Sequence, residues 1–172
     1  MRQFPKTILI ILVLSLCVGC DQATKNLAQE TLPVSQTISY LGGIVQLQYA
    51  ENPGAVLGLG ATLPPTVRVW TLIIFNGVLL AGMFWMIWKV KEMTFWSILG
   101  SALVIGGGIS NIYDRLVNGG AVIDFVHIGI GNLRTGIFNV ADAAILVGFG
   151  LLFVWSLQVK PQGPIEEPAP GE

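Results

Sequence analysis

Four long apolar blocks, separated by polar segments, dominate the pattern along this 172-residue chain. They cover residues 7–20, 67–88, 95–112 and 138–157. A helix of about 20 apolar residues crosses a bilayer, and the last three blocks have about that length. The first block is shorter, but helical continuation into Asp21–Lys25 would complete a span. The pattern therefore predicts four transmembrane helices.

The polar segments between the blocks contain stretches typical of β-strands. Residues 37–40 and 44–49 have the composition of strands and flank the Gly42-Gly43 pair, which favours a hairpin. Residues 122–128 are also strand-like. We therefore expect an all-α membrane fold, with four transmembrane helices and a small extracytoplasmic β element.

The chain is predicted to form one four-span domain over residues 1–160. Its outer loops would lie at about 21–66 and 113–137, and the Pro- and Glu-rich tail 161–172 is expected to be a disordered cytoplasmic segment. The cations at 2, 6, 89, 91 and 160 fall on one side, against those at 25, 68, 115 and 134 on the other. The positive-inside rule and the loop lengths together place both termini in the cytoplasm.

Composition excludes several classes of function. Charged residues make up only 11% of the chain, against 53% hydrophobic residues, whereas a soluble domain carries roughly a quarter charged. The net charge is −1 and there is no Lys/Arg-rich run, so no nucleic-acid partner is expected. Cys17 and Cys20 imply neither a disulfide framework nor a metal cluster, and His127 is the single histidine. We expect neither a metal nor a cofactor.

The first block has a rival interpretation as a secretory signal peptide. Arg2 and Lys6 precede an apolar stretch that ends in Val18-Gly19-Cys20, which resembles the signal of a lipoprotein precursor. Against this, Cys17 stands where such a signal usually has Leu, and three more spans follow. An uncleaved anchor is the favoured interpretation.

Polar residues gather at the helix ends that share one side of the membrane. Ionisable groups at this depth are costly, so they usually mark function. Asp124 lies in the strand-like run between the third and fourth spans. The cluster comprises Asp21 and Lys25, the Glu51–Gly54 segment, Asn111, Asp114 and Arg115, and Asn139 and Asp142.

Two of these carboxylates suggest catalysis. Asp142 is flanked by alanines, with no cation nearby in sequence, so it must face the bundle interior or a partner helix. If Asp124 meets it in a partly dry site, the two cannot easily both ionise, and one keeps a proton. Such a pair supplies a general base that activates water and a general acid that protonates a leaving amine. This is the chemistry of aspartic proteases.

The other polar residues also have structural interpretations. Asn139 is a favoured N-cap for the fourth helix, which does not exclude a role in the site. Asp21 and Asp114, each taken alone, are more simply interfacial charges in contact with headgroups, and Lys25 is more simply a snorkelling anchor. Arg115 most simply pairs with Asp114 or orients a loop. The triple glycine at 106–108 favours close helix packing.

Five polar motifs follow one another from the first span to the fourth. They are Asp21-Gln22-x-x-Lys25, Glu51-Asn52-Pro53-Gly54-Ala55, Asn111-x-x-Asp114-Arg115, Val122-Ile123-Asp124-Phe125 and Phe138-Asn139-Val140-Ala141-Asp142. In this order and spacing they resemble the bacterial lipoprotein signal peptidases, also called signal peptidase II. One such motif is a weak signal, whereas five in series are highly specific.

The resemblance implies a function and a location. Members of this family are four-helix enzymes of the bacterial inner membrane with a small extracytoplasmic β cradle and an active site at the outer leaflet. They are aspartyl endopeptidases that remove the signal peptide from diacylglyceryl-modified prolipoproteins, just before the lipidated cysteine. The implied partners are these substrates and membrane lipids, with no obligate protein partner.

The resemblance also assigns residues. The catalytic pair matches Asp124 and Asp142. The supporting or substrate-binding positions match Asn52, Gly54, Asn111, Arg115, Asn139, Asp21, Lys25 and Asp114, the last of these by pairing with Arg115. Two departures stand out. Ser110 replaces the usual Gly and is expected to crowd the helix exit slightly, and Val56-Leu57 replaces Ala-Phe, which would affect substrate preference.

Two other classes of function compete with this one. A small proton-coupled carrier would also use intramembrane Asp residues. However, the acidic residues crowd one side, and the opposite halves of the spans are nearly without charge, so no relay crosses the bilayer. A lipoprotein precursor is the third option, and a lipid-modified Cys20 at a mature N-terminus would support it.

Overall fold

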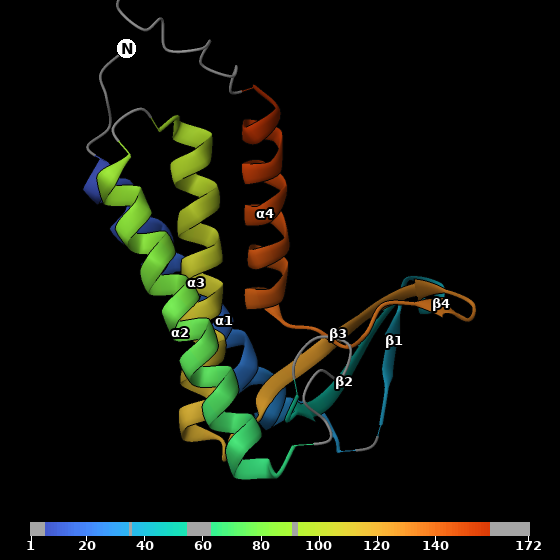
Figure 1. The fold of residues 1–172 in the computed structure, drawn as a ribbon. Helices are drawn as coiled ribbons and strands as arrows, with labels where there is room; N and C mark the ends of the chain where they lie inside the picture. Colours follow the sequence, from blue (N-terminus) through green and yellow to red (C-terminus); the bar gives the residue numbers. More distant parts are fainter. Residues whose placement is uncertain (1–5, 35, 55–62, 91–92, 159–172) are drawn as a thin grey trace, which may run out of the picture.

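Four long helices and a small antiparallel sheet make up the computed structural model, which describes residues 6–34, 36–54, 63–90 and 93–158 (Figure 1). All four helices are long and apolar enough to cross a membrane. The predicted fold class is therefore confirmed, and the chain is a multi-pass membrane protein. The helices are α1 (Lys6–Thr31), α2 (Pro65–Lys89), α3 (Phe95–Val117) and α4 (Val140–Gln158).

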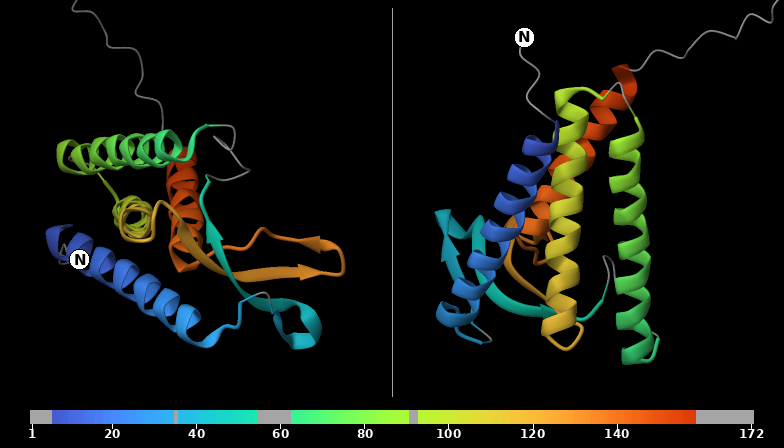
Figure 2. Two further views of the ribbon diagram at one scale, coloured as in Figure 1. Left: turned by 90° about the horizontal axis from the view of Figure 1, so that it is seen from below. Right: turned by 90° about the vertical axis from the view of Figure 1, so that its left-hand side faces the viewer.

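Helix α3 is the centre of the bundle. It packs against α1, α2 and α4, whereas α2 packs mainly on α3 alone (Figure 2). Glycines on α3 make this close packing possible. A Cβ atom at Gly107 would lie 2.5 Å from the carbonyl oxygen of Ala141 in α4, and one at Gly106 would lie 2.9 Å from the Cβ of Cys17 in α1. The packing interpretation of the triple glycine is confirmed.

The sheet has the strand order β1-β2-β3-β4, with all neighbours antiparallel. Its strands are β1 (Ile38–Tyr40), β2 (Val45–Asn52), β3 (Val122–Ile130) and β4 (Leu133–Arg134), with the short 3₁₀ turn η1 (Leu41–Gly43) between the first two. Gly42 and Gly43 adopt positive φ angles of 67° and 90°, which glycine tolerates without strain. The predicted hairpin and the third strand are both confirmed.

The sheet extends away from the bundle at the end where α1 and α3 finish and α4 begins (Figure 1). Strand β2 pairs with β3 from Val45 opposite Ile128 to Asn52 opposite Val122, with an irregularity between Leu47 and Ala50. This pairing brings the end of β2 beside the start of β3. The carboxyl end of β2 and the amino end of β3 therefore meet next to the helices.

Helix α1 runs further than its apolar block. It continues past Cys20 and the polar residues that follow, and it ends at Thr31. Cys20 thus lies inside a continuous helix, which favours the anchor interpretation over a cleaved signal. The predicted tail 161–172 and the Val56-Leu57 departure lie outside the described residues.

Candidate active site

Asp124 and Asp142 reach the same site from different elements. Asp124 is the third residue of β3 and is 2% exposed, and Asp142 lies in the first turn of α4. Two asparagines connect them. Asn139 donates from Nδ2 to Oδ1 of Asp124 at 2.7 Å, and Asn111 donates from Nδ2 to Oδ1 of Asp142 at 2.9 Å. The same Nδ2 of Asn139 lies 3.2 Å from Oδ1 of Asn111, so all four side chains belong to one hydrogen-bond network.

Asn139 also caps α4. Its Oδ1 accepts a hydrogen bond from the backbone N–H of Asp142 at 2.8 Å, and the backbone N–H of Asn139 donates to Oδ2 of Asp142 at 3.3 Å. This reciprocal arrangement is a capping box with Asp at its third position. The N-cap interpretation is confirmed, and the same residue contacts both carboxylates. The fold of the helix terminus therefore orients Asp142.

Asn52 holds the other side of Asp124. Its Nδ2 donates to Oδ2 of Asp124 at 3.0 Å, while its Oδ1 accepts from the backbone N–H of Gly54 at 3.0 Å. Burial raises the pKa of Asp124 to about 6, and the negative charge of Asp142 raises it as well. The hydrogen bonds from Asn52 and Asn139 act in the opposite direction, because they stabilise the ionised form. The pKa of this carboxyl group therefore lies well above the usual range of an aspartate.

Arg115 orients the segment that follows β2. It donates from Nη2 to the carbonyl oxygen of Gly54 at 3.0 Å and from Nη1 to that of Asn111 at 3.2 Å. The predicted pairing of Arg115 with Asp114 is wrong, because the carboxylate of Asp114 binds Lys25 instead. The alternative, that Arg115 orients a loop, agrees with its contact to Gly54.

Lys25 is the centre of a buried group of three charges, the ion triad Asp21–Lys25–Asp114. Its Nζ lies 2.6 Å from Oδ2 of Asp21 and 2.8 Å from Oδ2 of Asp114, and it donates to Oδ1 of Asn111 at 3.0 Å. The three charged side chains are between 0% and 1% exposed. The interpretations of Asp21 and Asp114 as headgroup contacts, and of Lys25 as a snorkelling anchor, are therefore wrong. Helix α3 brings Asp114 against α1, so Lys25 faces both carboxylates inside the protein.

The carboxylates of the ion triad also bind the backbone. Asp21 accepts from the N–H of Ala141 at 2.8 Å, and Asp114 accepts from the N–H of Ile123 at 3.1 Å. Ala141 immediately precedes Asp142, and Ile123 immediately precedes Asp124. The ion triad thus contacts the chain one residue before each of the two carboxylates.

Ser110 and Gln22 belong to this network, and the sequence analysis did not assign them to the site. Ser110 donates from Oγ to Oδ2 of Asp21 at 2.7 Å and accepts from Nε2 of Gln22 at 2.9 Å. Gln22 also donates to Oδ1 of Asp114 at 2.7 Å. Ser110 is fully buried and hydrogen-bonded on both sides, and the expected slight crowding of the helix exit stays a prediction. Its spacing of four residues from Asp114, on one face of α3, is the signal that could have identified it.

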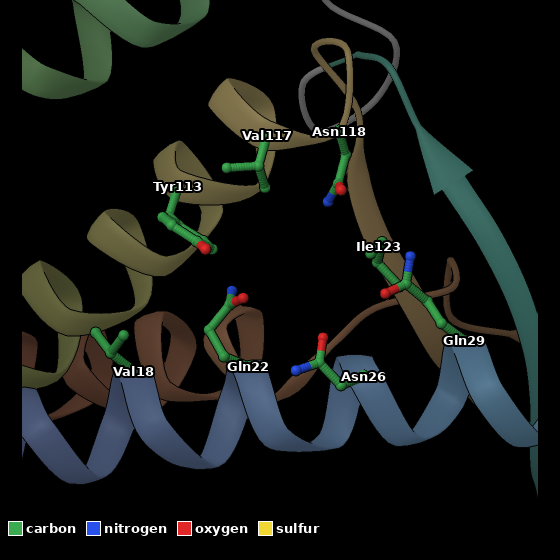
Figure 3. A pocket seen from close by; sticks show the side chains of 8 residues that line it. All are labelled: Val18, Gln22, Asn26, Gln29, Tyr113, Val117, Asn118 and Ile123. Carbon is green, nitrogen blue, oxygen red and sulfur yellow. The ribbon is translucent and has the colours of Figure 1, made fainter.

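A groove of about 270 Å³, lined in part by Gln22, lies between α1, α3 and β3 (Figure 3). Its lining contains four carboxamide side chains and neither Asp124 nor Asp142. It is lined by Val18, Gln22, Asn26, Gln29, Tyr113, Val117, Asn118 and Ile123. The groove and the carboxylate pair are therefore separate features.

Within the described residues, no three His, Cys, Asp or Glu side chains are arranged to hold a metal ion. What the network does contain is a pair of carboxylates held by neutral amides. One of them, Asp124, has a pKa raised to about 6 by burial. Such a pair can take a proton from water and give one to a leaving group.

Known proteins are similar to this chain in both sequence and fold. Residues 13–158 match the family model described as signal peptidase (SPase) II. The lipoprotein signal peptidase of Streptococcus pneumoniae is 31% identical over 158 residues, which cover 92% of this chain and 98% of that protein. That of Sphingopyxis alaskensis is 38% identical over 141 residues, which cover 80% and 78%.

A solved bacterial membrane enzyme structure has the same fold. It superposes with a TM-score of 0.77 over 94% of each chain, at 22% sequence identity. The match to the family model runs from within α1 to the end of α4 and includes the sheet, and the relatives are similar over most of their length. The chain therefore belongs to the signal peptidase II family of membrane peptidases.

Proposed function

We propose that this chain is an aspartyl endopeptidase that removes the signal peptide from diacylglyceryl-modified prolipoproteins. It hydrolyses the peptide bond just before the lipidated cysteine. The observation that carries the proposal is the single hydrogen-bond network in which Asn139 and Asn111 bridge Asp124 and Asp142. Family membership supports the substrate class.

The two carboxylates share the work of base and acid. One takes a proton from a water molecule, and the hydroxyl attacks the scissile carbonyl carbon to form a tetrahedral intermediate. The other donates its proton to the leaving nitrogen, and the C–N bond breaks. The products are the carboxylate end of the signal peptide and the free amine of the lipidated cysteine. The pair again holds one proton, now on the carboxyl group that acted as the base, and the new carboxyl end of the signal peptide releases its own proton to water.

An amide beside the pair stabilises the negative oxygen of the intermediate. The Nδ2 of Asn139 already lies within hydrogen-bond distance of Asp124, Asn111 and the carbonyl oxygen of Ile123. Asn52 is half-buried, ends β2 next to Asp124, and is the better donor for a substrate. A donor of this kind contributes about 3–4 kcal/mol to transition-state stabilisation in other enzymes. The Arg115 contact keeps the Gly54 segment beside this amide.

The site is assigned to the outer leaflet of the bacterial inner membrane, with both termini in the cytoplasm. Lys6 donates to the carbonyl oxygens of Ile87 and Val90, at the opposite end of the bundle from the sheet. Exposed Trp85, Trp88 and Trp96 surround that end as an interfacial belt would. The substrate helix then lies in the membrane beside the bundle, with its acyl chains in lipid and its cleavage site at the level of Asp124.

The test is cleavage of a diacylglyceryl-modified prolipoprotein by the detergent-purified protein, followed as a size shift. Asp124→Asn and Asp142→Asn are each expected to keep the fold and to lower kcat by about 10²–10⁴-fold, because each removes a proton-transfer group. Glu30→Gln is the matched control, since Glu30 is an exposed carboxylate near the end of α1. Near-normal cleavage by either Asp variant contradicts the catalytic assignment. Failure of the wild-type protein contradicts the substrate class.

A further inference from the structure

We propose that Ser110 is a positioning residue for the peptidase reaction, acting through Asp21 on the start of α4. The inference rests on the proposed function, and it concerns a position at which the sequence analysis expected only crowding. Ser110 touches neither Asp124 nor Asp142. Its hydroxyl donates to the carboxylate of Asp21, and that carboxylate binds the backbone N–H of Ala141, the residue before Asp142.

The ion triad needs neutral donors as well as its lysine. An ammonium group has three N–H donors, and Lys25 directs them at Asp21, Asp114 and Asn111. Two carboxylates face one cation, so a net negative charge remains in a buried place. Buried charges are tolerated only when hydrogen bonds satisfy their remaining lone pairs. Ser110 and Gln22 supply two such bonds, one to each carboxylate.

Ser110 determines how the carboxylate of Asp21 is turned. Oδ2 of Asp21 accepts from both Lys25 and Ser110, which leaves Oδ1 directed at the N–H of Ala141. That N–H is one of the first in α4 and has no partner within the helix. A carboxylate at this place also interacts favourably with the positive end of the helix dipole. The orientation of Asp21 therefore fixes the first turn of α4 at Ala141. Asp142 is the residue that follows Ala141.

Gln22 orients the hydroxyl of Ser110 and connects the hydrogen-bond network to β3 through Asp114. It rises from α1 toward α3, as Figure 3 shows. Its amide donates to Ser110, which directs the hydroxyl proton of Ser110 at Asp21, and also to Asp114. Asp114 in turn binds the N–H of Ile123, the residue before Asp124. A glycine at position 110 has no hydroxyl and could make neither hydrogen bond. The contacts of Ser110 with Asp21 and Gln22 are therefore specific to the serine in this chain.

The experiment compares Ser110→Ala with Ser101→Ala in the full-length purified protein. Both serines are fully buried in α3, but Ser101 donates only to the carbonyl oxygen of Ser97, one turn away. Ser110→Ala is expected to lower kcat about tenfold with little change in KM, because misplacing a catalytic group slows chemistry more than binding. Ser101→Ala is expected to change kcat less than twofold. The substrate is the same diacylglyceryl-modified prolipoprotein.

Hydrogen–deuterium exchange supplies a readout that does not depend on activity. The peptide that contains Ala141 is expected to exchange faster in Ser110→Ala than in the wild type, and to be unchanged in Ser101→Ala. Equal kcat values for the two variants, or unchanged exchange at Ala141 in Ser110→Ala, overturn the positioning role. If the wild type does not cleave the substrate, the proposed function fails, whereas the exchange comparison still decides the role of Ser110.

Discussion

Of the two amides that lower the pKa of Asp124, Asn52 has the larger effect. The hydrogen bond from Asn52 stabilises the ionised carboxylate and so opposes the effect of burial on its pKa. Asn52→Ala removes this bond and leaves the burial in place. The pKa of Asp124 is therefore expected to rise above about 6, because the ionised form loses a stabilising hydrogen bond. The limb of the pH dependence of kcat that reports this group is expected to move to higher pH by the same amount.

Infrared spectroscopy of the protonated carboxyl band, recorded against pH, measures this shift directly. Gln46→Ala is the control, because Gln46 lies on the same strand and its side chain donates to Ser39, away from the site. A titration of Asp124 that moves to lower pH in Asn52→Ala, or that moves equally in the control, contradicts the assigned role of the Asn52 hydrogen bond.

At the residue scale, the sequence identified the polar residues of the site but not all of their partners. Asp114 and Arg115 are adjacent in the sequence, which predicts that they pair. Neighbouring residues on a helix point to different faces, however, so Asp114 meets α1 while Arg115 meets the segment after β2. Lys25 lies 89 positions before Asp114, and only the packing of α1 on α3 identifies it as the partner.

Gly107 lets α3 pack closely against the first turn of α4. A Cβ atom there would lie 2.5 Å from the backbone oxygen of Ala141, and backbone cannot rotate away as a side chain can. Gly107→Ala is therefore expected to push the start of α4 outward and to lower kcat at least tenfold, since small displacements of catalytic groups are costly. The protein is also expected to be less stable, because overpacking a core costs about 1–3 kcal/mol.

Gly77→Ala is the matched control, because a Cβ atom at Gly77 in α2 meets nothing within 4 Å. It is expected to leave kcat unchanged and to stabilise α2 slightly, since alanine favours helix by about 1 kcal/mol over glycine. The two variants are compared by cleavage rate and by thermal unfolding in detergent. Equal rates would show that α4 tolerates a methyl group at this contact.

At the scale of elements, the length of the apolar blocks predicted the four helices and strand composition predicted the hairpin, but neither signal predicts where α1 ends. The apolar block stops at Cys20, yet the helix continues to Thr31. Its buried stripe passes through Cys17, Asp21, Lys25 and Ala28, at helical spacing. Two charged residues take the place of apolar ones in this stripe because they are paired inside the protein.

At the scale of the whole molecule, the bonds of the ion triad connect α1, α3, β3 and α4. Lys25→Met leaves Asp21 and Asp114 buried without their cation. Removing one partner of a buried charge group typically lowers the free energy of unfolding by about 3–5 kcal/mol. The variant is therefore expected to unfold at markedly lower temperature or lower denaturant concentration in detergent than the wild type.

Lys89→Met removes a lysine that lies exposed at the end of α2. Substitutions at such positions usually change the free energy of unfolding by less than about 0.5 kcal/mol. Similar losses of stability in the two lysine variants would mean that the ion triad contributes little to holding the elements together. A loss of stability in Lys25→Met alone would agree with the burial of the three charged side chains of the ion triad.

The Asp21–Lys25 ion pair within α1 also bears on how the protein is made. The two residues are four apart on one helix and 2.6 Å from each other, so α1 carries within itself the partner that each of these charges needs in the bilayer. Asp114 has no such partner on α3 and finds its cation on α1. The first helix is therefore an assembly template for the third, and a chain whose first helix is exchanged for a generic apolar anchor would deliver α3 to the membrane with an uncompensated carboxylate.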